Sequence, residues 1–342
     1  MHTFAEIPMK TVGPIKIRGF VNQDISVPLA TLETPLWFSV SRGAKVSMLS
    51  GGITTTVLDS RMTRSIILEA QDASAALSFA QKIKASEEDL QKVVSSSSHI
   101  AKLIDINYQI AANLIYLRLG FFTGDASGHN MATNAADRIF NWILDNYKEL
   151  KYCSISGNYC CDKKVSAVNG ILGRGRSVVA EISVPRAICE EYLHTTPEKI
   201  ADINTKKNLL GSILAGSLRS GNAHYANMLL AFYLATGQDA ANIVEGSQGV
   251  TFAEVSGDCL KLSCTLPNLI MGTVGNGKNL PYSEETLTFL GCREEHKPGE
   301  NGDRLAAICA ATVLCGELSL LAAETNPGEL IKAHLRIERG KK

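Results

Sequence analysis

Several features that would indicate a nucleic-acid-binding, metal-binding or secreted protein are missing from this sequence. Its 342 residues contain 34 Lys and Arg and 34 Asp and Glu, so the formal net charge is zero. This balance predicts no general attraction to nucleic acid or to a membrane surface. None of the nine cysteines forms a Cys-x-x-Cys pair, which argues against a zinc site or a disulfide framework. We therefore expect free thiols in a reducing cytoplasm and no bound metal.

A secretory leader, a membrane span and a Rossmann fingerprint are lacking as well. Residues 1–6 show no basic start followed by an apolar run. The most apolar segment, residues 305–323, is interrupted by Glu317 and rich in small residues, which predicts a buried helix. Residues 173–175 (Gly-Arg-Gly) lead into a strand-like segment and lack the third glycine of a dinucleotide-binding turn. An anionic ligand must therefore be held by local groups of Lys and Arg.

The apolar pattern predicts a globular protein of two domains. A hydrophobic content of 45% and a charged content of 20% are ordinary for a soluble chain that can bury a large core. A helix is expected over residues 72–84, with Asp72 as its N-cap, and helical structure is expected to continue over residues 87–103. Residues 208–240 are apolar on all sides, which predicts the buried central helix of the larger domain. Residues 252–267 are expected to form an antiparallel hairpin.

One short segment, residues 154–166, combines small polar residues with three adjacent charges. Its Ser-Gly-Asn at residues 156–158 predicts a turn. Asp162, Lys163 and Lys164 are consecutive, so they would point in different directions on a helix and could not pair on one face. The residues alone allow two interpretations: a solvated charged turn, or a loop that presents charge to a ligand.

With its flanks, Ser-Gly-Asn-Tyr-Cys-x-Asp-Lys-Lys at residues 156–164 resembles the substrate loop of 3-hydroxy-3-methylglutaryl-CoA (HMG-CoA) reductases. Other segments resemble motifs of that family and occur in the family's order. They are Pro-Leu-Ala-Thr-x-Glu ending at Glu33, Met-Thr-Arg at residues 62–64, Gly-Asp-Ala-x-Gly-x-Asn-Met at residues 124–131 and Leu-Ile-Lys-Ala-His ending at His334. Residues 272–277 (Gly-Thr-Val-Gly-Asn-Gly) are similar to a glycine-rich loop near the family's cofactor. The resemblance covers nearly the whole chain and favours the eukaryote-like class.

The resemblance implies an α+β fold in which a large domain is built round a long central helix. A small α/β (ferredoxin-like) cofactor domain is inserted into it. Residues 1–65 and 154–342 would form the large substrate-binding domain, and residues 66–153 the small one. The implied ligands are HMG-CoA, CoA and NADPH, with NADH as an alternative, and the implied assembly is a homodimer or a higher homo-oligomer.

Site residues carried over from the family fall into three groups. The catalytic group is Glu33, Lys163, Asp239 and His334. The substrate-binding group is Arg64, Ser156, Asp162, Lys164, Lys207 and Asn227 for the HMG part, with His224 and Arg42 for CoA. The cofactor-binding group is Asp125, Gly128, Asn130, Met131, Val274, Gly275 and Gly277.

The chemistry of thioester reduction suits these residue types. Negative charge develops on the carbonyl oxygen, and a fixed ammonium such as Lys163 would stabilise it. Glu33 would donate protons, which requires a carboxyl group that burial keeps protonated. Asp239 would hydrogen-bond to both, although the residues alone favour a structural N-cap of the next helix. His334 would protonate the departing CoA thiolate, which suits an imidazole that titrates near neutral pH.

Some positions depart from the family pattern. Only 32 residues precede Glu33, and the family's upstream Glu-Asn-Val-Ile-Gly motif is absent from this sequence. His129 replaces a methionine of the cofactor motif; it could lie near the cofactor, but a surface imidazole is the expectation. Lys278 either reaches the 2′-phosphate of NADPH or is a solvated loop lysine. Two functions are therefore considered: an active HMG-CoA reductase, and a shortened non-catalytic relative that binds CoA esters or a protein partner.

Overall fold

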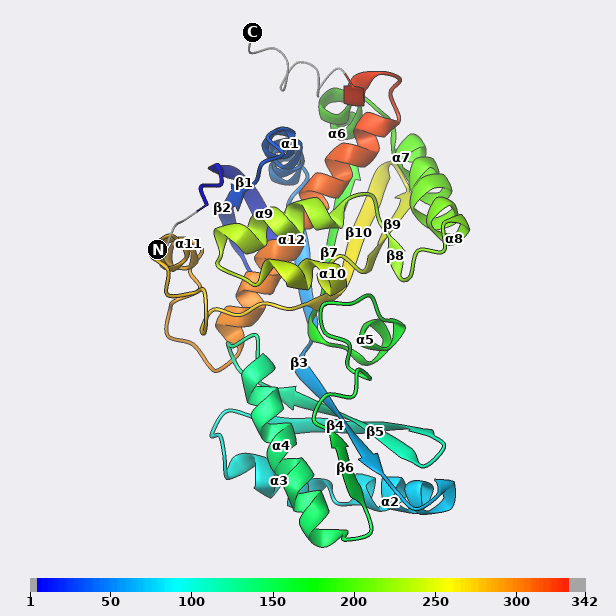
Figure 1. Ribbon diagram of the computed structural model, residues 1–342. Coiled ribbons are helices and arrows are strands. Elements are labelled where there is room, and N and C mark those ends of the chain that lie inside the picture. Colours follow the sequence, from blue (N-terminus) through cyan, green and yellow to red (C-terminus); the bar gives the residue numbers. More distant parts are fainter. Residues whose placement is uncertain (1–4, 332–342) are drawn as a thin grey trace.

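The computed structural model describes residues 5–331, which form two parts connected by one long strand. This strand, β3 (Ile53–Glu69), has 17 residues. Its first half belongs to the sheet of the larger part and its second half to the sheet of the smaller part. In Figure 1 it runs from the upper part of the molecule into the lower part.

In the larger part the strand order is β2-β1-β3-β7-β10-β9-β8. β1 pairs in parallel with β3, as β8 does with β9, and the other neighbours are antiparallel. Buried and more exposed residues alternate along most of β10, because only one face of this sheet packs on the core. The predicted hairpin is confirmed as β9 and β10. The bounds are β1 (Met9–Gly19), β2 (Gln23–Ala30), β7 (Gly175–Pro185), β8 (Ser220–Gly221), β9 (Gly249–Ser256) and β10 (Cys259–Leu269).

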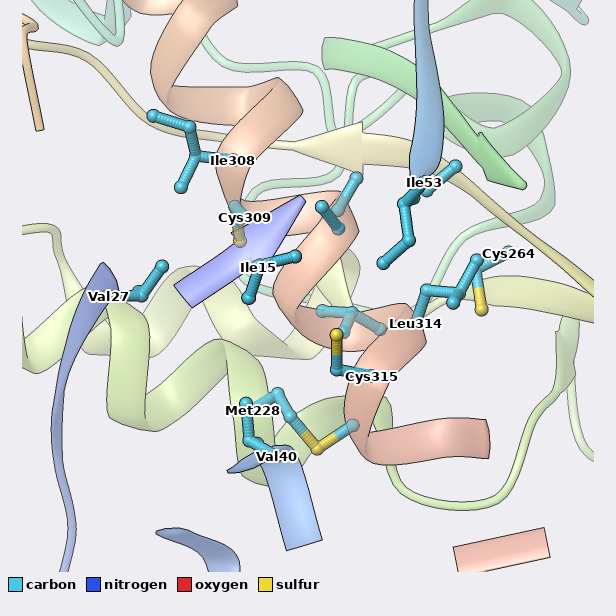
Figure 2. Close-up of a cluster of buried hydrophobic side chains, with 14 of the residues drawn as sticks. Ile15, Val27, Val40, Ile53, Met228, Cys264, Ile308, Cys309, Leu314 and Cys315 are labelled. Atoms are coloured by element: carbon cyan, nitrogen blue, oxygen red, sulfur yellow. The ribbon is translucent and has the colours of Figure 1, made fainter. Parts of the chain in front are cut away.

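The larger core surrounds helix α12 (Glu300–Glu324). Figure 2 shows Ile308, Cys309, Leu314 and Cys315 of this helix among apolar side chains from the strands and from two other helices. These are α1 (Pro35–Leu49) and α9 (Tyr225–Ala235). By length and composition α12 could cross a membrane, but 94% of its most apolar window is buried inside the protein. The buried helix predicted over residues 305–323 is thus confirmed as a core helix.

The prediction of a central helix over residues 208–240 is wrong. That segment contains the end of a π-helix, η2 (Asn204–Gly211), then α8 (Ser212–Leu214), β8 and α9. Gly216 and Arg219 have positive φ values of 68° and 54°, which a continuous right-handed helix cannot contain. The apolar residues of this segment are therefore divided among several elements, and α12 takes the central position.

The smaller part has its own apolar core, made by residues 62–150 together with Ile270. Asp72 caps the predicted first helix, since its side chain accepts a hydrogen bond from the Ala75 N–H at 2.8 Å. The second predicted helix ends early, because the Ser96 and Ser97 hydroxyls donate back to the Val93 and Val94 carbonyls and a strand follows. The bounds are α2 (Ala73–Ala85), α3 (Glu87–Ser95), β4 (Lys102–Ala111), β5 (Leu114–Phe122), α4 (His129–Asn146) and β6 (Lys151–Ser154).

Short helices connect the remaining elements of the larger part. They are α5 (Ala167–Leu172), α6 (Arg186–Ile188), the π-helix η1 (Cys189–Leu193), α7 (Pro197–Ile203), the 3₁₀ helix η3 (Ala240–Asn242), α10 (Ile243–Gly246) and α11 (Pro281–Phe289). The loop between β6 and α5 lies at the junction of the two parts (Figure 1). This loop contains Asp162, Lys163 and Lys164.

Candidate functional site

Lys163 and Asp239 form an ion pair at the junction of the two parts. The Lys163 Nζ lies 2.7 Å from Asp239 Oδ2, and the two side chains are 42% and 52% exposed. Each charge favours the other, so the hydrogen bond raises the pKa of Lys163 and lowers the pKa of Asp239. Asp239 also accepts from the Ala241 N–H at 3.0 Å, so it is both a cap of η3 and a partner of Lys163.

The backbone of Lys163 is held by a buried acid. Lys163 has a φ of 55°, which is uncommon for a residue with a side chain, and its N–H donates to Glu245 Oε1 at 3.0 Å. Glu245 also accepts from the Asn242 amide at 3.0 Å, and burial raises the pKa of its carboxyl group. The turn that presents the Lys163 ammonium is thus fixed by α10 of the larger part.

Asp162, next to Lys163, lies at the centre of a cluster of donors. Its Oδ1 accepts from Arg174 Nη2 at 2.8 Å and lies 3.2 Å from His129 Nε2 and 3.5 Å from the Asn242 amide. The His129 hydrogen bond, followed by the Arg174 charge, lowers the pKa of Asp162 well below its ordinary value. The expectation of a surface imidazole at His129 is wrong, because this half-buried side chain contacts the loop. Arg174, which the sequence interpretation missed, is almost fully buried.

Arg64, another predicted substrate residue, lies beside the same loop, which itself contains the predicted residues Ser156 and Lys164. Arg64 on β3 donates from Nε to the Ile155 carbonyl at 3.0 Å, directly before Ser156. The Gly157 N–H donates to the Ser65 carbonyl at 2.8 Å, and a Cβ at Gly157 would lie 2.8 Å from the Ser65 hydroxyl. The absence of a side chain at Gly157 therefore allows the loop to approach β3. Lys164 donates to the Asp162 carbonyl at 3.2 Å.

A hollow of about 730 Å³ opens beside Lys163 and Asp239. Its walls come from the N-terminal end of α4 and from the glycine-rich loop at residues 274–278. The predicted cofactor residues that line it are Gly128, Asn130, Met131, Val274, Gly275 and Gly277. Asp125 does not line this hollow: its carboxylate accepts from the Gly302 N–H at 2.9 Å, in the first turn of α12.

Lys278 also lines this hollow, and its side chain is buried. The residue is only 4% exposed, so the interpretation as a solvated loop lysine is wrong. Its Nζ donates to the Asn276 carbonyl at 3.2 Å. Burial lowers the pKa of Lys278 to about 8, and the nearby negative charge of Asp239 acts in the opposite direction.

Three other predicted residues line a second hollow of about 170 Å³. Glu33, Arg42 and His224 line it, together with apolar side chains such as Leu36 and Phe38. His224 Nε2 lies 3.0 Å from the Gly316 carbonyl, and its Nδ1 lies 3.4 Å from the Asn227 amide. The two hollows share no lining residue, and among the described residues Glu33 forms no hydrogen bond or ion pair with Lys163 or Asp239.

The segment that follows α12 reaches this second hollow. We call residues 325–331 the strap; Glu324 is the last residue of α12. Glu324 pairs with Lys207, and Glu329 Oε1 lies 2.6 Å from Arg42 Nη1. His334 lies outside the described residues. Within residues 5–331, no group of three or more His, Cys, Asp or Glu side chains is placed to hold a metal ion.

Comparison with known proteins gives one family. The sequence model of hydroxymethylglutaryl-coenzyme A reductase matches residues 1–339. The chain is 45% identical to an HMG-CoA reductase of Aeropyrum pernix over 98% of this chain and 80% of that protein, and 45% identical to one of Pyrococcus abyssi over 98% and 82%. It is 40% identical to one of the fungus Phycomyces blakesleeanus, over 98% of this chain and 29% of that larger protein.

A solved structure shows the same fold. The class II HMG-CoA reductase of Streptococcus pneumoniae, bound to NADPH in open conformations, matches with a TM-score of 0.76. The match covers 96% of this chain and 78% of that one, at 19% sequence identity. The predicted α+β fold class is confirmed, while the boundaries at residues 65 and 153 stay predictions. The sequence matches and the shared fold lead to one conclusion: this chain belongs to the hydroxymethylglutaryl-coenzyme A reductase family.

Proposed function

We propose that this chain reduces HMG-CoA to mevalonate and CoA with two hydrides from a reduced nicotinamide cofactor. Two protons complete the balance, so that one thioester becomes one primary alcohol and one thiol. The observation that carries the proposal is the Lys163–Asp239 ion pair, which lies at the edge of a hollow suited to a cofactor. Archaeal relatives at 45% identity that are named HMG-CoA reductase support the same reaction.

The groups around the larger hollow suit a nicotinamide dinucleotide. The N-terminal end of α4 begins at Gly128 without a side-chain cap, which leaves backbone N–H groups free for a phosphate. Gly275 has a φ of 104°, and a Cβ at this position would meet no atom within 4 Å, so the loop leaves room for a ligand. The bound cofactor would supply hydride to the carbonyl carbon of the substrate.

Residues of the chain would stabilise the charge that develops during hydride transfer and would donate the protons. The Lys163 ammonium would stabilise the negative charge that develops on the carbonyl oxygen. Asp239 would keep Lys163 charged and in place. Glu33 would donate a proton, and His334 would protonate the CoA thiolate before it leaves.

The first experiment measures oxidation of NADPH by the purified protein in the presence of HMG-CoA, with mevalonate as the identified product. Turnover that depends on HMG-CoA supports the proposal. A folded protein that binds CoA esters without oxidising the cofactor would instead be the non-catalytic relative considered above.

We further propose NADPH rather than NADH as the preferred cofactor. The 2′-phosphate needs a cation or free N–H groups, and Lys278 with the adjacent glycine-rich turn offers both beside the hollow. The kcat/KM values of the two cofactors test the preference, and Lys278→Ala tests the contact. A better rate with NADH would contradict the preference. An equal loss for both cofactors in the variant would contradict the role of Lys278.

A complete site would form between two copies of the chain, because Glu33 and Lys163 line separate hollows within one copy. We therefore propose a homodimer or a higher homo-oligomer. The test mixes two inactive variants, Glu33→Gln and Lys163→Ala, under conditions that exchange subunits. If each site uses both subunits of a dimer, random mixing restores about a quarter of wild-type activity. If each site lies within one chain, no activity returns.

A further inference from the structure

Two cations proposed to bind the substrate, of which Arg42 lines the second hollow, are already paired with carboxylates of the same chain. Arg42 pairs with Glu329, and Lys207 pairs with Glu324. Glu324 is the last residue of α12, whereas Glu329 belongs to the strap. Arg42 and Glu329 line the hollow, and their side chains are only 24% and 28% exposed. An anionic ligand of this hollow therefore meets an arginine whose charge is shared with a glutamate.

The orientation of Arg42 does not depend on Glu329. Its Nε donates to the Tyr192 carbonyl at 3.2 Å and its Nη2 donates to the Leu193 carbonyl at 2.7 Å. These two backbone acceptors fix the plane of the guanidinium. Glu329 contacts the remaining nitrogen, Nη1, at 2.6 Å. Removal of the glutamate would thus release the donors of Nη1 and leave the guanidinium in place.

The strap has other attachments that would remain when Glu329 leaves Arg42. The Thr325 hydroxyl donates to the Thr195 hydroxyl at 2.6 Å, and the Asn326 amide donates to the His194 carbonyl at 3.0 Å. The same amide donates to Glu329 Oε2 at 2.9 Å, which holds the carboxylate beside Arg42. Displacement of Glu329 therefore requires a local movement and leaves α12 intact.

We propose that Glu329 competes with the substrate for Arg42. The Glu329 carboxylate occupies the position beside Arg42 that a phosphate of the substrate takes when it binds. A phosphate resembles the carboxylate in charge and in its acceptor oxygens, so both suit the same guanidinium. Glu329 thus sets the affinity of this hollow for an anionic ligand. The inference rests on the proposed function in one respect, namely that CoA is the source of the phosphate.

The experiment is a calorimetric titration of the full chain with two probes, CoA and inorganic pyrophosphate, at fixed ionic strength. Glu329→Gln keeps the size of the side chain but removes the charge and leaves one acceptor oxygen, so that it cannot accept from Arg42 and Asn326 through two separate oxygens. A partly exposed ion pair of this kind is weak, so the dissociation constant of each probe should fall about two- to five-fold. The matched control is Glu190→Gln, which removes the same charge from an exposed position of η1, the helix that ends at Leu193.

A double-substitution cycle assigns the effect to the contact. In an Arg42→Ala background, Glu329→Gln should leave both dissociation constants unchanged. Unchanged or weaker binding of both probes to Glu329→Gln alone would overturn the proposal, because Glu329 would then position Arg42. An equal fall of the dissociation constants in Glu190→Gln would also overturn the proposal, because the effect would then come from the net charge of the protein and not from the contact with Arg42. If pyrophosphate responds as expected but CoA does not bind, the contact competes as proposed and the CoA function fails.

Discussion

Replacement of Lys163 by Ala should remove most of the activity and little of the stability. The ammonium is the group proposed to stabilise the developing oxyanion, and loss of one such group commonly lowers kcat by about 10²–10³. The ion pair with Asp239 is about half exposed, so its contribution to folding is on the order of 0–1 kcal/mol. The backbone bond from Lys163 to Glu245 does not involve the side chain and should persist in the variant.

The assay compares kcat, KM and the free energy of unfolding in urea for wild type and three variants. The matched control is Lys206→Ala, because Lys206 pairs with Asp202 at the same distance of 2.7 Å in an exposed position. That variant should lose comparable stability and keep wild-type kcat. Lys163→Arg should also be poorly active, since the broader guanidinium does not place its charge at one point. A well-folded Lys163→Ala protein with nearly normal kcat would refute the assigned role.

Three other predictions concern stability. The donors around Asp162 hold the pKa of its carboxyl group below the ordinary value. The free energy of unfolding of wild type should therefore fall as the pH drops below about 4. Urea titrations in acid should show a smaller fall for Asp162→Asn. Lys278→Met removes a buried ammonium, so the free energy of unfolding at pH 7 should rise by on the order of 2–3 kcal/mol. This gain should shrink between pH 8 and about 10.5, because in that range Lys278 has lost its proton in the folded protein and keeps it in the unfolded chain. Gly43→Ala would place a Cβ 2.2 Å from the Cys315 carbonyl oxygen, so the free energy of unfolding should fall by about 1–3 kcal/mol. The control is Gly211→Ala, whose Cβ would lie 3.6 Å from its nearest neighbour and should have little effect.

Elements with strong local signals could be predicted from the sequence. The cap at Asp72, the hairpin turning at Gly257 and the long apolar run of α12 each specify their structure through nearby residues. The segment at residues 208–240 misled the interpretation because its composition is that of a buried helix. Its breaks at Gly216 and Arg219 are set by backbone conformation, which composition does not reveal.

Residues of the candidate site that belong to a motif could be predicted from the sequence. Their partners from distant parts of the chain could not. Motif resemblance located Lys163 and Asp239, 76 positions apart, and the structure pairs them. It gave no sign that Arg174 would hold Asp162 or that Glu329 would reach Arg42. Those partners are ordinary charged residues in the sequence, and only the fold brings them together. Lys278 was ambiguous for a related reason, since burial of a loop lysine depends on what packs around it.

The pairing of β3 with β6 has a consequence for the loop that carries Lys163. The chain enters the smaller part along β3 and leaves it along β6, and Ile67 and Ser154 are partners across these two strands. Inside the smaller part the end of β3 and β6 are therefore hydrogen-bonded neighbours, and the Gly157 N–H bonds back to the Ser65 carbonyl just after the chain leaves β6. Residues 155–166 continue directly from β6, so the turn that carries the Lys163 ammonium is tied to β3 by this pairing.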